Sequence, residues 1–125
     1  MYHQSIKTGK MQIKELISWQ DFEKIDMRVG TIVKAEVFAK AKKPAYQLLI
    51  DFGAELGLKK SSAQITNLYQ PEDLTGKQII AVVNFPPKQI ANFISECLVL
   101  GVLGAGTDVT LLTTSLATDN GLPIA

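Results

Sequence analysis

The stretch Asp26-Met27-Arg28-Val29-Gly30-Thr31-Ile32-Val33-Lys34 decides the fold, and the alternation that it begins continues to Phe38. In an extended chain, alternate residues from Met27 to Val33 fall on one side and those from Arg28 to Lys34 on the other. Gly30 lies within this unusually long strand. Such a glycine predicts a sharply coiled strand that serves two parts of a barrel.

The rest of the chain predicts further strands separated by short connections. They are expected at residues 46–52, 58–64, 77–84 and 93–103, with a short sixth strand at 109–113. A short helix is expected at 18–25 after the cap residue Ser18, and one helical turn at 67–69. Five strands with a short helix between the third and fourth predict an all-β, five-stranded OB-fold Greek-key barrel. A ferredoxin-like fold would need two full-length helices, which the sequence does not supply.

Length and composition predict one domain. The chain has 125 residues, of which 46% are apolar, enough for a single packed core. Residues 1–14 are expected to form a disordered or non-native extension, and residues 15–125 the domain. A lone cysteine and a polar N-terminus favour a reducing, cytoplasmic location. The longest apolar run, residues 97–105, is too short for membrane insertion.

The net charge of +1 conceals a basic segment. Residues 28–60 hold seven basic side chains against three acidic ones, so this part carries +4. Such clustering is typical of a surface that binds phosphate or an acidic partner, although a solvated charged face is an equally good interpretation. The residues of a possible RNA-contacting face are Lys34, Lys40, Lys42, Lys43, Lys59, Lys60 and Lys88. Because Arg28 is the only arginine, bidentate reading of bases is not expected.

No pattern in the sequence predicts catalysis. Cys97 lies in an apolar segment, and its only possible base is the distant His3, so a buried core thiol is favoured over a nucleophile. No serine has a histidine base or a Gly-x-Ser-x-Gly turn. Clustered Cys and His residues, which zinc requires, are absent from the sequence. We therefore expect no catalytic residues, no metal site and no cofactor.

Five segments together resemble the tRNA-binding OB-fold family. They are Asp26–Glu36, Leu49–Gly53, Ser61–Thr66, Ala81–Lys88 and Ser95–Gly101, in that order along the chain. Within this family, Ser-Ser-Ala-Gln-Ile-Thr and Asn-Phe-Pro-Pro are similar to the branch of CsaA-type protein-export chaperones. The resemblance covers residues 18–124, essentially the whole domain.

The resemblance implies a dimeric, non-enzymatic chaperone that binds unfolded preprotein segments for secretion. It implies an apolar pocket at the barrel mouth, formed by Lys34, Ser62, Gln64, Asn84, Phe85, Pro86, Lys88, Ser95 and Leu98. Asn84 and Gln64 would hydrogen-bond a peptide there, or alternatively satisfy strand ends. The implied homodimer forms through the segments that flank the barrel, with Trp19, Phe22, Ile25, Leu111, Leu112, Leu116 and Leu122 at the interface. The export ATPase and tRNA are further possible partners.

A structure-specific tRNA-binding module acting in trans is the alternative function. Two departures from the tRNA-binding relatives weaken it. Neutral residues, such as Gln89 and Asn92, surround Lys88 where relatives carry further basic residues. Ser95-Glu96-Cys97-Leu98 replaces Ser-Gln-Gly-Met, and the Glu96 carboxylate would repel phosphate.

Overall fold

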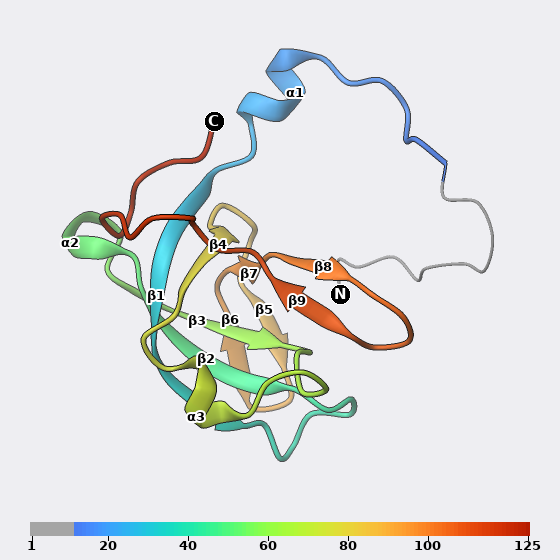
Figure 1. Ribbon diagram of the computed structural model, residues 1–125, viewed down its shortest axis with the longest axis vertical. Coiled ribbons are helices and arrows are strands. Elements are labelled where there is room, and N and C mark those ends of the chain that lie inside the picture. Colours follow the sequence, from blue (N-terminus) through green and yellow to red (C-terminus); the bar gives the residue numbers. More distant parts are fainter. Residues whose placement is uncertain (1–11) are drawn as a thin grey trace.

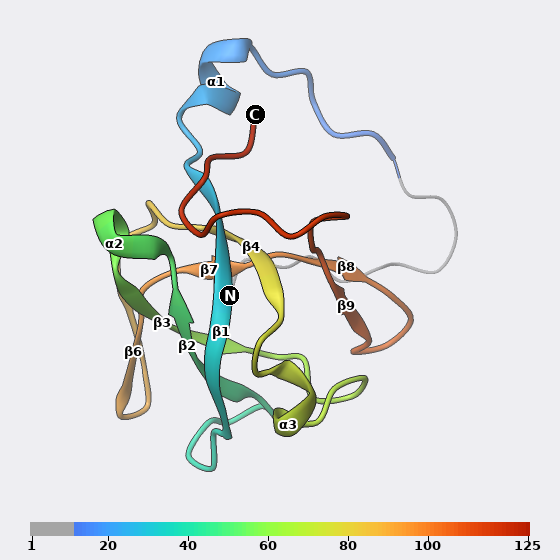
Figure 2. The ribbon, with the colours of Figure 1, turned by 60° about the vertical axis from the view of Figure 1, so that its left-hand side comes forward.

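The computed structural model describes residues 12–125 of the chain. Its elements follow in the order α1 (Trp19–Glu23), β1 (Met27–Val37), β2 (Tyr46–Asp51), α2 (Gly53–Leu56), β3 (Leu58–Ala63), α3 (Pro71–Leu74), β4 (Gln78–Val82), β5 (Lys88–Ile90), β6 (Phe93–Ser95), β7 (Leu98–Val99), β8 (Gly101–Leu103) and β9 (Val109–Leu111). The β5–β6 and β8–β9 hairpins lie on opposite sides of the barrel (Figure 2). Helix α1 projects beyond one end of β1, and the β1–β2 loop lies at the other end (Figure 1).

Strand β1 serves two parts of a nearly closed barrel, as the sequence predicts. The sheet order is β3-β2-β1-β4-β7. Residues 27–31 of β1 pair with β4, and residues 31–37 pair with β2, both antiparallel. A register shift at residue 33 bends the strand between these two partners. The all-β OB-fold prediction is therefore confirmed.

Gly30 lies where β1 packs closely against the core. A Cβ atom at this position would come within 2.6 Å of Ile50 Cγ2 and 2.7 Å of Phe52 Cε1. Both of these side chains are fully buried. The glycine is therefore required because β1 passes directly over the core, as well as for the coiling of the strand.

The barrel closes between β3 and the segment 95–97 largely through side chains. Glu96 N–H donates to the Lys60 carbonyl at 2.8 Å, and the Glu96 carboxylate accepts the Lys60 N–H at 2.9 Å. The Ser61 hydroxyl donates to the Cys97 carbonyl at 2.9 Å. Ser95 and Glu96 thus take the place of a regular backbone ladder along this edge of β3.

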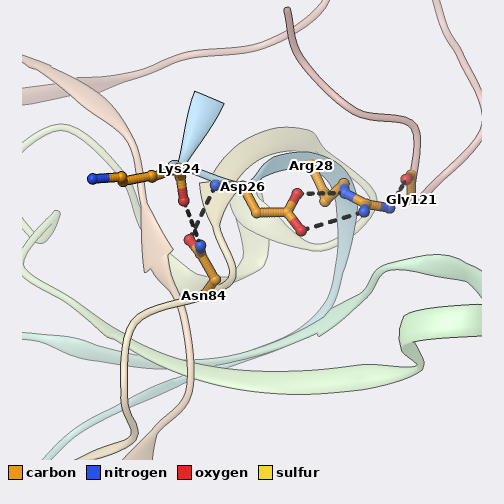
Figure 3. Close-up of polar contacts among 5 residues, drawn as sticks. All are labelled: Lys24, Asp26, Arg28, Asn84 and Gly121. Atoms are coloured by element: carbon orange, nitrogen blue, oxygen red, sulfur yellow. Dashed lines mark hydrogen bonds and ion pairs between the residues drawn. The ribbon is translucent and has the colours of Figure 1, made fainter. Parts of the chain in front are cut away.

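The C-terminal tail, residues 120–124, runs along the free side of β1. Gly121 N–H donates to the Val29 carbonyl, and Val29 N–H donates to the Leu122 carbonyl. The Arg28 guanidinium bonds the Gly121 carbonyl at 2.9 Å and the Asp26 carboxylate (Figure 3). The hydrogen bond to Asp26 raises the pKa of Arg28. The only arginine is therefore used to join the tail to β1.

Three sequence expectations differ from the structure. The strand expected at 93–103 is broken into β6, β7 and β8, because each part has a different partner: β6 pairs with β5, β7 with β4 and β8 with β9. Strand β5 was not expected after two prolines. The helical turn lies at Pro71–Leu74 rather than at 67–69, since proline suits the first helical position and Gln70 and Asp73 form a capping box.

The main core fills the barrel. Its fully buried members include Ile32, Leu48, Ile50, Phe52, Leu74 and Ile79. None of the helices in residues 12–125 has the length and apolar character needed to cross a membrane. The expectation of an extension at residues 1–14 falls mostly outside the described residues; residues 12–14 are exposed.

Candidate functional site

A small hollow under the β5–β6 hairpin brings together five of the residues expected at a pocket. These are Phe85, Pro86, Lys88, Ser95 and Leu98, and the hollow is completed by Ile90, Glu96 and Cys97. Its volume is about 10 Å³, close to the space that one water molecule needs. A bound side chain would therefore require the Phe85-Pro86 segment or the hairpin to move outward.

Aromatic packing holds the hairpin over the hollow. Phe93 of β6 packs against Phe38 of the β1–β2 loop, with ring centroids 5.4 Å apart. Lys60 Nζ lies 5.3 Å from the Phe93 ring centroid, within the range of a cation–π contact. Ala45 completes this second, smaller core. The hairpin, the β1–β2 loop and β3 therefore meet at one end of the barrel.

The other residues expected at the pocket lie outside the hollow. The Asn84 amide donates to the Lys24 carbonyl at 2.7 Å and accepts the Asp26 N–H at 3.0 Å (Figure 3). Ser62 is buried, and its backbone N–H donates to Ser95 Oγ. Asn84 thus clamps the chain between α1 and β1, and Ser62 takes part in barrel closure.

The remaining two expected residues are also separate from the hollow. Lys34 is exposed on β1 and forms an ion pair with Glu36 at 3.0 Å. Gln64 follows β3 and is half-buried, but it is not among the residues lining the hollow. Sequence reasoning missed the contributions of Ile90, Glu96 and Cys97, because only the hairpin brings them to the same place.

Several of the expected basic residues gather near the hollow. Lys40, Lys42 and Lys43 are exposed on the β1–β2 loop, which packs against the hairpin that carries Lys88. Lys60 reaches the same end from β3 through its contact with Phe93. This basic end has no arginine, because Arg28, the only arginine of the sequence, bonds the Gly121 carbonyl of the C-terminal tail. Its cations are thus point charges suited to phosphate or carboxylate rather than to reading bases.

Cys97 is buried beneath the hollow. Burial raises the pKa of its thiol to about 12, so the thiol is neutral at physiological pH. Glu96, expected to repel phosphate, directs its carboxylate to the Lys60 N–H. Among residues 12–125, no group of three His, Cys, Asp or Glu side chains is placed to hold a metal ion.

The flanking segments expose apolar side chains at the end of the barrel opposite the basic loop. Trp19 on α1 is 77% exposed and Leu116 is 79% exposed. Phe22 is half-buried and meets the Trp19 ring edge-on at 6.3 Å. Leu111, in contrast, packs against the main core. Exposed surface for a partner therefore lies on α1 and residues 112–122, with Leu111 facing inward.

Comparison with known proteins connects this geometry to a family. Residues 27–123 match the family model of the tRNA binding domain. Two chaperone CsaA crystal structures, from Bacillus anthracis and Picrophilus torridus, are 52% and 56% identical, with TM-scores of 0.85 and 0.83. They cover 89% and 88% of this chain, and all of each solved chain.

Relatives of a second kind are linked to methionyl-tRNA synthesis, and the ligases among them are much longer proteins. The methionine–tRNA ligase of Phocaeicola vulgatus is 38% identical over 83% of this chain, which spans 15% of that ligase. A solved protein related to methionyl-tRNA synthetase, from Pyrococcus horikoshii, is 28% identical with a TM-score of 0.79; the match covers 90% of this chain and all of that one. The chain belongs to the tRNA binding domain family, and within it is similar to chaperone CsaA.

Proposed function

We propose that the protein is a non-enzymatic, dimeric, cytoplasmic chaperone that binds unfolded preprotein segments for secretion. The observation that carries the proposal is the hollow between Phe85, Pro86 and Leu98, which offers apolar contact beside the cation of Lys88. Once the Phe85-Pro86 segment or the hairpin has moved outward, the hollow would form an apolar slot with few polar groups, which suits side chains of an extended peptide. The likeness to chaperone CsaA supports the same function, with the export ATPase as a candidate partner.

Peptide binding is tested by titrating the protein with a fluorescent, unfolded preprotein segment. Phe85→Ala should weaken binding by about 2 kcal/mol, as expected for an aromatic anchor at a binding hot spot. Leu68→Ala is the matched control, because Leu68 is also exposed but lies in the turn before α3. If both variants bind the peptide with equal affinity and keep the fold, the hollow is not the peptide-binding site.

The alternative is a tRNA-binding module that acts in trans. The observation in its favour is the basic end formed by the β1–β2 loop, together with the family to which the chain belongs. Changing Lys40, Lys42 and Lys43 together to Gln should weaken tRNA binding and flatten its salt dependence, but leave peptide affinity nearly unchanged. If tRNA binds tightly at physiological salt and the peptide does not bind, the alternative is the correct function.

A homodimer is part of the proposal. Leu112, Leu116 and Leu122 are exposed along the C-terminal segment, and Trp19 is exposed on α1. Exposed apolar side chains of this number are characteristic of an interaction surface. A two-fold contact would cover the same residues on both copies.

A further inference from the structure

A second cavity lies between the start of β4, the end of β9 and the segment before α3, and it shares no lining residue with the hollow under the β5–β6 hairpin. It has a volume of about 250 Å³ and is lined by Tyr69, Lys77, Gln78, Ile79, Leu111 and Thr113. Neither peptide binding in the hollow nor tRNA binding at the basic end uses it, although Thr113 belongs to the segment 112–122 proposed for dimerisation. Tyr69 and Leu111 are partly buried and pack against the main core, so they give the cavity an apolar wall, whereas Ile79 is fully buried behind it.

The wall of this cavity is held rigidly. The Gln78 amide donates to the Thr118 carbonyl at 2.6 Å and accepts the Thr118 N–H at 3.1 Å. The Thr113 hydroxyl donates to the Gln78 carbonyl at 2.8 Å. Residues 113–118 are thereby fixed against the start of β4. A cavity with fixed walls loses little entropy when a ligand enters.

Two hydrogen-bond donors remain at the cavity. The Tyr69 hydroxyl accepts the Leu111 N–H at 3.0 Å, and its own proton is donated to no group within residues 12–125. Lys77 is exposed and forms no ion pair with another described residue. Gln78 has no capacity left, because both atoms of its amide are already bonded. The arrangement therefore favours a ligand that accepts hydrogen bonds and carries negative charge.

We propose that this cavity binds a small carboxylate with a branched apolar body. The carboxylate would accept from Tyr69 Oη and Lys77 Nζ, while the apolar body would contact Leu111 and the Tyr69 ring. Two ligands share this chemistry, a free acylated amino acid and the C-terminal residue of a peptide. The volume accommodates one residue of leucine size.

The test is a titration of the full, isotopically labelled chain, followed through backbone amide chemical shifts. The probes are N-acetylleucine, its neutral amide, and a tripeptide that ends in leucine. We expect saturable shifts at Tyr69, Ile79 and Leu111 with the acids, and much smaller shifts with the amide. Equal affinity for the two acids would assign the site to any leucine carboxylate, whereas preference for one identifies the source.

Two variants test the donors. Lys77→Gln should weaken N-acetylleucine binding about threefold to fivefold, as for an exposed ion pair. Tyr69→Phe should weaken it further, and Lys42→Gln is the matched control on the opposite loop. The proposal is wrong if the shifts do not saturate, if the amide binds equally well, or if Lys77→Gln changes nothing. It is also wrong if binding disappears at high protein concentration, because a second copy would then cover the cavity.

Discussion

At the scale of single residues, the burial of the Cys97 thiol makes the stability of the folded protein depend on pH. Its thiol pKa is raised to about 12 in the folded protein, against an ordinary value of 9.0. Below pH 9 the thiol is neutral in both states and contributes no pH dependence. Above that pH the unfolded chain loses the proton and the folded chain keeps it, so stability falls as pH rises.

The effect of Cys97 is predicted as the difference in unfolding free energy between the wild type and Cys97→Ala. The unfolding free energy of the wild type relative to Cys97→Ala should fall by up to about 1.4 kcal/mol per pH unit above pH 9. Urea unfolding at several pH values measures this, and subtracting the variant removes the contributions of lysines and tyrosines. A pH-independent difference would show that Cys97 titrates normally.

Asn84 is predicted to be a structural residue. Asn84→Ala removes the two hydrogen bonds to Lys24 and Asp26, and should lower the unfolding free energy by about 1 to 2 kcal/mol. Peptide affinity of the folded protein should stay the same. Gln20→Ala is the control, because this exposed amide on α1 has no bond to a described residue. Weaker peptide binding without loss of stability would instead show that Asn84 contacts the peptide.

At the scale of elements, the β5–β6 hairpin has an unfavourable turn. Ala91 has a φ of 51°, a value that favours glycine, and it is the first of two residues joining Ile90 to Phe93. Ala91→Gly should raise the unfolding free energy by about 0.5 to 1 kcal/mol. Relief of the left-handed conformation gains about 1 to 2 kcal/mol, and the greater freedom of glycine in the unfolded chain offsets about 0.4 to 1 kcal/mol of that. Thermal unfolding measures the change. A lower melting temperature would contradict the prediction, because it would show that the entropy of glycine in the unfolded chain outweighs the strain at Ala91.

The elements also show what a sequence can predict. The alternation from Met27 onward predicts the extent of β1, but burial along the strand does not follow two faces. Val29 and Ile32, which the alternation places on opposite sides, are both buried, and Val33 is exposed at the register shift. Strand β5 is short and mostly exposed, so it has no such pattern. The grouping of Phe85 and Leu98 was expected from the resemblance. The clamp by Asn84 could not be predicted, since its partner Lys24 lies 60 positions away and offers only a backbone carbonyl.

At the scale of the whole molecule, we expect a homodimer through α1 and residues 112–122. Trp19→Ser should weaken dimerisation by about 2 kcal/mol or more, as for a central aromatic residue of an interface. Sedimentation at micromolar concentration measures it, with Leu68→Ser as an exposed apolar control elsewhere. A wild-type species of only 13.7 kDa would contradict the prediction.

The pairing of the C-terminal tail with β1 has a consequence for the order of folding. It joins Arg28 to Gly121, 93 positions apart, whereas β2 and β3 are joined by only a short connection. The tail lies at the chain terminus and is held to β1 by a few edge hydrogen bonds, so we expect it to dock late and to detach before the barrel strands separate. Detachment exposes the backbone of β1 around Val29, an edge that can pair with another chain. Local opening of the tail would then set the rate at which the protein begins to aggregate.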